Sequence, residues 1–92
     1  AHRADPLAGL EWTSGDYSAL TSLVQQAGPG PGRTVVFLEG GYDLGALTSS
    51  VRSTLATLAD LDHDPEPTSA AGHGEEAVAA AKRFRQRALD GG

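Results

Sequence analysis

The stretch RTVVFLEGGYDLGAL, residues 33–47, decides the fold expected from this sequence. Its first part, Thr34–Leu38, is β-branched, aromatic and apolar without polar alternation, the pattern of a strand covered on both faces in a parallel sheet. A short buried helix is the competing interpretation, but the length of the run and the flanking glycines favour a strand. The sequence therefore predicts an α/β fold with Tyr42 at the carboxyl end of a buried strand, where open α/β sheets usually bind ligands.

Helices are predicted on both sides of this strand. Thr13 and Asp16 have the spacing of a capping box, and the apolar positions that follow recur at helical intervals, so we expect a helix over residues 14–27. The Gly-Pro-Gly-Pro-Gly run at residues 28–32 ends it. After Tyr42, Asp43 is placed to cap a second helix that reaches Ala59 or Asp60.

The remaining sequence divides the chain into three parts. Residues 1–61 form the α/β portion, and residues 62–74, DHDPEPTSAAGHG, are rich in proline, small residues and acids and are predicted to be a linker. Residues 75–92 are expected to form a last helix and tail. Glu75 and Glu76 lie at the amino-terminal, positive end of its dipole, and four cations lie toward the carboxyl-terminal, negative end: Lys82, Arg83, Arg85 and Arg87. An exposed polar face is the expected role of these cations, with an acidic partner as the alternative.

Composition limits the classes of protein that this chain can represent. With 92 residues, 39% hydrophobic and 21% charged, it can form one small globular domain. A net charge of -5 argues against direct binding to nucleic acid. The absence of cysteine excludes disulfides and thiolate metal sites and fits a cytoplasmic protein.

No apolar run approaches the roughly 18 residues of a membrane span, and no secretory leader is recognisable. Oligomeric state is not predicted.

A single predicted strand leaves the expected sheet incomplete. The backbone groups of a strand covered on both faces need neighbouring strands, and no second strong strand is found in these residues. Because the chain also starts at Ala1 and contains no methionine, we expect it to be the carboxyl-terminal part of a larger α/β domain. The alternative is that residues 7–12 pair with the strand, although that run is short and interrupted by Gly9.

The residues after the strand predict a ligand site. Gly40 and Gly41 allow a close approach of the backbone to a ligand, and the phenol of Tyr42 can donate a hydrogen bond to a carbonyl oxygen on which negative charge develops. A tyrosine that only packs its ring is the structural alternative. A phosphate loop is disfavoured because Tyr42 occupies the position of the second glycine in the dinucleotide fingerprint and no Gly-Lys-Ser/Thr follows. A small nucleotide-binding unit remains the weaker possibility.

Two motifs resemble the zinc-dependent histone deacetylases, in the branch with class II enzymes, acetoin-utilisation proteins and acetylpolyamine amidohydrolases. AHRADPL at residues 1–7 is similar to the end of the family segment Phe-Asp-Ala-His-x-x-Asp-Pro-Leu, and LEGGYDL at residues 38–44 is similar to a second family motif. Thr13 and Tyr17 match the helix start between them. The resemblance covers about residues 1–61 and implies an arginase/deacetylase fold, a mainly parallel sheet flanked by helices.

The resemblance also implies roles for four residues. Tyr42 would hydrogen-bond the acetyl carbonyl and stabilise the oxyanion, Leu7 would line the tunnel for the acetylated side chain, and Gly40 and Gly41 would form its floor. The substrate would be acetylated lysine or an acetylated polyamine. Zinc would be the cofactor, but the family's ligands are expected upstream of Ala1, so this chain supplies none. A non-catalytic scaffold that keeps the fold is the alternative.

The remaining aspartate, histidine and tryptophan candidates are expected to have structural rather than catalytic roles. Asp5 is expected to cap its own turn, with a place at the pocket rim as the alternative. His2 is not a metal ligand in the family pattern. His63 and His73 lack metal-ligand spacing and are predicted to be solvated. Trp12 is expected to cover an edge of the core.

Overall fold

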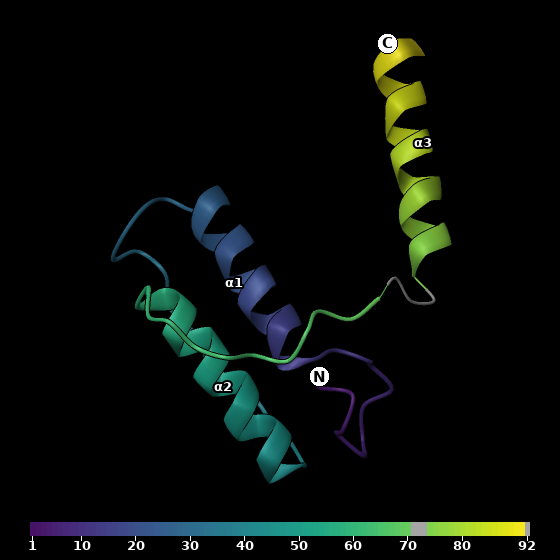
Figure 1. Ribbon diagram of the computed structural model, residues 1–92. Helices are drawn as coiled ribbons and strands as arrows, with labels where there is room; N and C mark the ends of the chain where they lie inside the picture. Colours follow the sequence, from purple (N-terminus) through teal and green to yellow (C-terminus); the bar gives the residue numbers. More distant parts are fainter. Residues whose placement is uncertain (71–73, 92) are drawn as a thin grey trace.

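Three helices make up the regular structure of the chain, and the computed structural model describes residues 1–70 and 74–91. Helix α1 spans Ser14–Ala27, α2 spans Leu44–Leu58 and α3 spans Glu75–Gly91. Helices α1 and α2 pack against each other and run in the same direction, with residues 28–43 crossing from the end of one to the start of the other (Figure 1). Helix α3 projects away from this pair.

The starts of the helices follow the sequence signals. Thr13 accepts a hydrogen bond from the backbone of Asp16, and the Asp16 carboxylate accepts one from the backbone of Thr13, which confirms the predicted capping box. Asp43 caps α2 by accepting a hydrogen bond from the Ala46 amide at 2.8 Å. Helix α3 begins at Glu75 as predicted, with both acids in its first turn. It continues four residues past Arg87, so its last turn contains no cation.

The predicted parallel sheet is wrong. No strand occurs in residues 1–70 or 74–91, and Thr34–Leu38 is irregular backbone. A strand needs a neighbour for its amide and carbonyl groups, and none of the described residues forms a ladder with this run. Its side chains are therefore not covered on both faces: Val35 is 75% exposed and Phe37 79%. Residues 7–12 do not pair with this run either. Instead, His2 and Trp12 form an isolated parallel bridge.

Segment 62–69 lies across the packed helices rather than free in solvent. The Thr13 hydroxyl donates to the Pro67 carbonyl at 2.7 Å, and the Ser14 hydroxyl accepts from the Glu66 amide at 2.9 Å. Gly15 packs so closely that a Cβ there would overlap the Glu66 carbonyl oxygen. The predicted linker is thus bound to the start of α1 through residue 69, while residues 71–73, including His73, lie outside the described residues.

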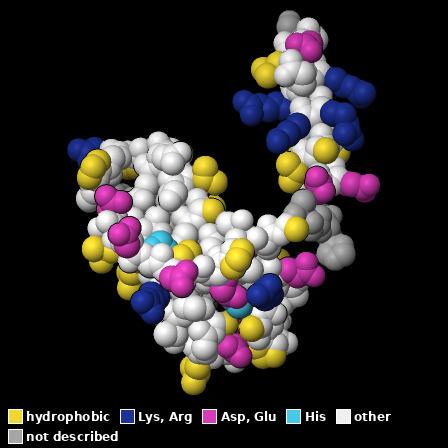
Figure 2. Space-filling view, in the orientation of Figure 1, with side chains coloured by type: hydrophobic (Ala, Val, Ile, Leu, Met, Phe, Trp, Pro, Cys, Tyr) yellow, Lys and Arg dark blue, Asp and Glu magenta, His cyan; other side chains and the backbone are white. Residues whose placement is uncertain are grey.

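The apolar core is small. Ala46 is the one hydrophobic residue that is buried among those described, and the other buried side chains are polar. Trp12 is half-buried and packs edge-to-face on Tyr17, with ring centroids 5.3 Å apart. In the space-filling view, basic side chains gather along the middle of α3, and acidic ones lie near its ends and over the rest of the visible face (Figure 2). No residue of α3 is buried.

Candidate functional site

Asp5 connects the two motifs that the sequence singled out. One carboxylate oxygen of Asp5 accepts a hydrogen bond from the Leu7 amide at 2.9 Å. The other accepts one from the Tyr42 amide at 3.0 Å. The first bond confirms that Asp5 caps its own turn, and the second crosses 37 positions of sequence. Asp5 therefore brings Leu7 and Tyr42 to the same place.

The two glycines before Tyr42 have backbone conformations that other residues rarely adopt. Gly40 has φ +71° and Gly41 has φ +119°. A Cβ on Gly41 would lie 2.7 Å from a methyl carbon of Leu47, and one on Gly40 would lie 3.7 Å from the ring of Tyr42. The glycines thus turn the chain sharply into α2 and leave the tyrosine ring close to the backbone.

Tyr42 lies just outside the helix that follows it. Asp43 is the N-cap of α2, so no bond within the helix holds Tyr42. The residue is 65% exposed, and its ring lies beside Gly40. The phenol is therefore accessible to a ligand, and its backbone is held by Asp5.

A hollow of about 670 Å³ lies between α1, α2 and residues 34–41, and we call it the interhelical hollow. Its helical walls include Leu20 and Val24 of α1 and Val51 and Leu55 of α2. Of the four predicted site residues, Gly40 and Gly41 line this hollow, whereas Leu7 and Tyr42 do not. Leu7 is 71% exposed on the loop that Asp5 closes. The structure thus brings the two glycines, but not Leu7 or Tyr42, to the wall of the hollow.

The described residues do not fit the zinc that the resemblance implies. Within residues 1–70 and 74–91, no three His, Cys, Asp or Glu side chains are grouped so that they could hold a metal ion. His2, the histidine nearest the first motif, is buried and lies 2.6 Å from the Glu66 carboxylate. Its other ring nitrogen is 3.0 Å from the Ala4 amide. Both nitrogens of His2 therefore have protein partners.

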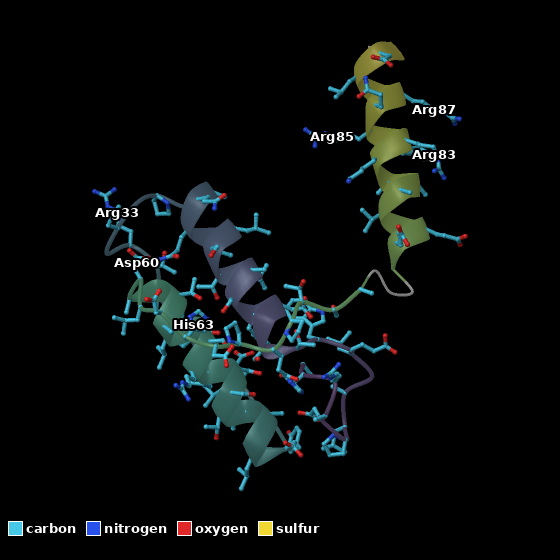
Figure 3. All side chains as sticks on the ribbon, in the orientation of Figure 1. Arg33, Asp60, His63, Arg83, Arg85 and Arg87 are labelled. Carbon is cyan, nitrogen blue, oxygen red and sulfur yellow. The ribbon has the colours of Figure 1, made fainter. Side chains whose placement is uncertain are left out.

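The sequence did not predict the polar cluster around Glu66. Besides His2, this carboxylate contacts the Arg3 guanidinium and the Ser14 amide, each at 3.1 Å. A second missed contact joins Ser18 to His63 at 2.7 Å, so His63, predicted to be solvated, is half-buried beside α2 (Figure 3). These pairs are separated by 45 to 64 positions, and nothing local in the sequence indicates them.

Hydrogen bonds lower the pKa values of the Asp5 and Glu66 carboxyl groups. The Leu7 and Tyr42 amides hold the pKa of Asp5 below its ordinary value, because they bond to the charged form. The hydrogen bond with His2, followed by that from the Ser14 amide, lowers the pKa of Glu66 to about 2. Burial and the charge of Asp5 raise the pKa of Tyr17. Asp5 is thus ionised at neutral pH and faces the tyrosine loop as an anion.

No helix in the described ranges is long and apolar enough to cross a membrane.

Comparison with known proteins agrees with the two motifs. Residues 1–58 match the histone deacetylase domain. The chain is 46% identical over 56 residues to Histone deacetylase 10, chloroplastic, of Oryza sativa subsp. japonica, covering 59% of this chain and 13% of the relative. It is 41% identical over 64 residues to Histone deacetylase 14, chloroplastic, of Arabidopsis thaliana, covering 67% and 15% respectively. No solved structure matches significantly.

The two plant relatives are much longer than this chain, which spans about one seventh of their length. Their names place those two proteins in the chloroplast and give no support to the cytoplasmic location expected from the sequence. Both motifs, all of α1 with its cap, and all of α2 fall within the matched residues 1–58. Because this match covers more than half of the 92 residues, the chain belongs to the histone deacetylase domain family.

Proposed function

We propose that these residues supply the oxyanion-stabilising tyrosine and part of the pocket wall of a deacetylase that hydrolyses acetyl-lysine or acetylpolyamine amides. The observation that carries the proposal is the position of Tyr42. It is exposed, follows two glycines with positive φ, and is bonded through its amide to the loop that holds Leu7. Membership of the histone deacetylase domain family supports the reaction class. The class II, acetoin-utilisation and acetylpolyamine branch rests on the resemblance of the two motifs.

The proposed role of Tyr42 follows from the charge changes in amide hydrolysis. When water adds to the acetyl carbon, the carbonyl oxygen becomes an oxyanion, and a donor already in place stabilises it without reorganisation. The phenol O–H of Tyr42 is such a donor. Leu7 would contact the aliphatic part of the acetylated side chain, and Gly40 and Gly41 would lie under the acetyl group. Since residues 1–70 and 74–91 offer no metal-binding group, any zinc would be held by residues other than these.

Tyrosine-to-phenylalanine exchange in the full-length protein that carries this sequence tests the proposal. Tyr42→Phe keeps the ring and removes the donor, so we expect turnover of an acetyl-lysine peptide or an acetylpolyamine to fall roughly 10²- to 10³-fold. Tyr17→Phe is the matched control, because it removes the other phenol in the chain. Unchanged turnover in Tyr42→Phe would refute the proposed role. A native protein that lacks both bound zinc and amidase activity would instead identify a non-catalytic scaffold.

A further inference from the structure

We infer that Asp5 is a positioning residue for Tyr42, holding the tyrosine in register with the Leu7 loop through the bond from the Tyr42 amide. The inference rests on the proposed function and deepens it, because it names the group that aims the oxyanion donor. The carboxylate has two oxygens, and each accepts a different amide, one from its own turn and one from the tyrosine loop.

The backbone before Tyr42 explains why an external acceptor matters. Gly40 and Gly41 lack a Cβ, so many backbone conformations are open to them and the peptide that carries the Tyr42 amide is poorly restrained. Helix α2 begins after its N-cap Asp43 and does not extend to this amide. Among the described residues, the bond to Asp5 is the hydrogen bond that holds the Tyr42 amide.

Charge and geometry both favour a carboxylate at position 5. A hydrogen bond to an ionised acceptor is about twice as strong as one between neutral groups. An asparagine has a single acceptor oxygen and an NH₂ group that only donates, so it can bond one of the two amides but not both. Asp5→Asn therefore removes one of the two bonds and leaves the other with a neutral, weaker acceptor, with almost no change in side-chain volume.

Asp43 offers a matched control. It is adjacent to Tyr42, and one of its carboxylate oxygens accepts a hydrogen bond from the Ala46 amide at 2.8 Å. Asparagine caps helices as well as aspartate does, so Asp43→Asn removes one negative charge beside the tyrosine while it keeps its hydrogen bond. A difference between Asp5→Asn and Asp43→Asn thus reports the Asp5 bond rather than the loss of charge.

The test combines kinetics with amide exchange in the full-length protein labelled with ¹⁵N-tyrosine. We expect Asp5→Asn to lower kcat about tenfold to a hundredfold with little change in KM, because a donor misplaced by about 1 Å loses this much. We also expect it to speed exchange of the Tyr42 amide, whereas Asp43→Asn does neither. In the Tyr42→Phe background, Asp5→Asn should have little further effect, since the group that it positions is gone.

The outcomes separate this inference from the proposed function. Equal loss of kcat from Asp5→Asn in both backgrounds would show a general structural role and overturn the inference. Native kcat in Asp5→Asn, together with a large loss in Tyr42→Phe, would overturn the inference and leave the proposed function standing. Native kcat in Tyr42→Phe would overturn both.

Discussion

The imidazole of His2 lies 2.6 Å from the carboxylate of Glu66 and joins the first family motif to the proline-rich segment after α2. Arg3 and the Ser14 amide contact the same carboxylate. The start of the chain, the start of α1 and segment 62–69 therefore meet at one acidic side chain. Glu66 lies beyond residues 1–58, so this contact ties the segment that follows the family match to the matched part.

Acid should weaken the attachment of segment 62–69 to α1, because it protonates the Glu66 carboxylate that accepts from the Ser14 amide. The folded-state pKa of Glu66, about 2, is below its ordinary value of 4.5, so its contribution to stability is complete above pH 4.5 and is lost as pH falls toward 2. The ¹⁵N shift of the Ser14 amide in the full-length protein should follow this titration with a midpoint near 2. Glu66→Gln should abolish the step, and a midpoint near 4.5 would show that the contact is absent in solution.

Alanine should be tolerated less well at Gly41 than at Gly40. The φ of +119° at Gly41 is strained for any L residue, at a cost of about 1–3 kcal/mol, and a Cβ there meets Leu47 at 2.7 Å. At Gly40, φ is +71° and the nearest contact is an ordinary 3.7 Å. We expect deacetylase turnover to fall further in Gly41→Ala than in Gly40→Ala. Gly9→Ala is the control because its Cβ would meet nothing within 4 Å, and the reverse order would refute the assigned backbone geometry.

His63 should carry its proton on Nδ1. That nitrogen lies 3.2 Å from the Leu61 carbonyl, which can only accept, so the neutral ring leaves Nε2 to accept from the Ser18 hydroxyl at 2.7 Å. The ¹⁵N shifts of His63 in the neutral form should report this tautomer. Ser18→Ala removes the donor and should move the tautomer balance toward Nε2–H, whereas Ser22→Ala on the same helix should not. A native Nε2–H tautomer would contradict the assignment.

The 92 residues alone should not unfold cooperatively. Ala46 is the one buried hydrophobic residue among those described, while Phe37, Leu44 and Phe84 are 76–79% exposed. So little buried apolar surface cannot offset the conformational entropy of the chain. We expect calorimetry to show a broad change without a sharp transition. A single cooperative peak from this chain would contradict the prediction.

Local sequence signals predicted the helices closely. The capping box of Thr13 and Asp16, the cap at Asp43 and the acids at Glu75 act within one turn, so they determine helix starts without help from the rest of the fold. The end of α2 at Leu58 falls only one or two residues before the predicted end. Asp5 capped its own turn as predicted for the same reason.

Contacts between distant residues could not be predicted in this way. The apolar run Thr34–Leu38 has the composition of a buried strand, but a strand exists only when a neighbour satisfies its amides and carbonyls, and the described residues provide none. Segment 62–69 has the composition of a linker, yet Glu66 binds it to α1 through residues more than 50 positions away.

The sequence by itself determined the helix starts, the glycine turn before Tyr42 and the two motifs of the deacetylase family, because each depends on neighbouring residue types. Only the tertiary structure decided that Asp5 holds Tyr42 beside the Leu7 loop and that Glu66 binds His2 and α1. Asp5 has a local partner in the Leu7 amide and gains its second only when the tyrosine loop meets it, whereas His2, Arg3 and Ser14, which contact the Glu66 carboxylate, all lie more than 50 positions away.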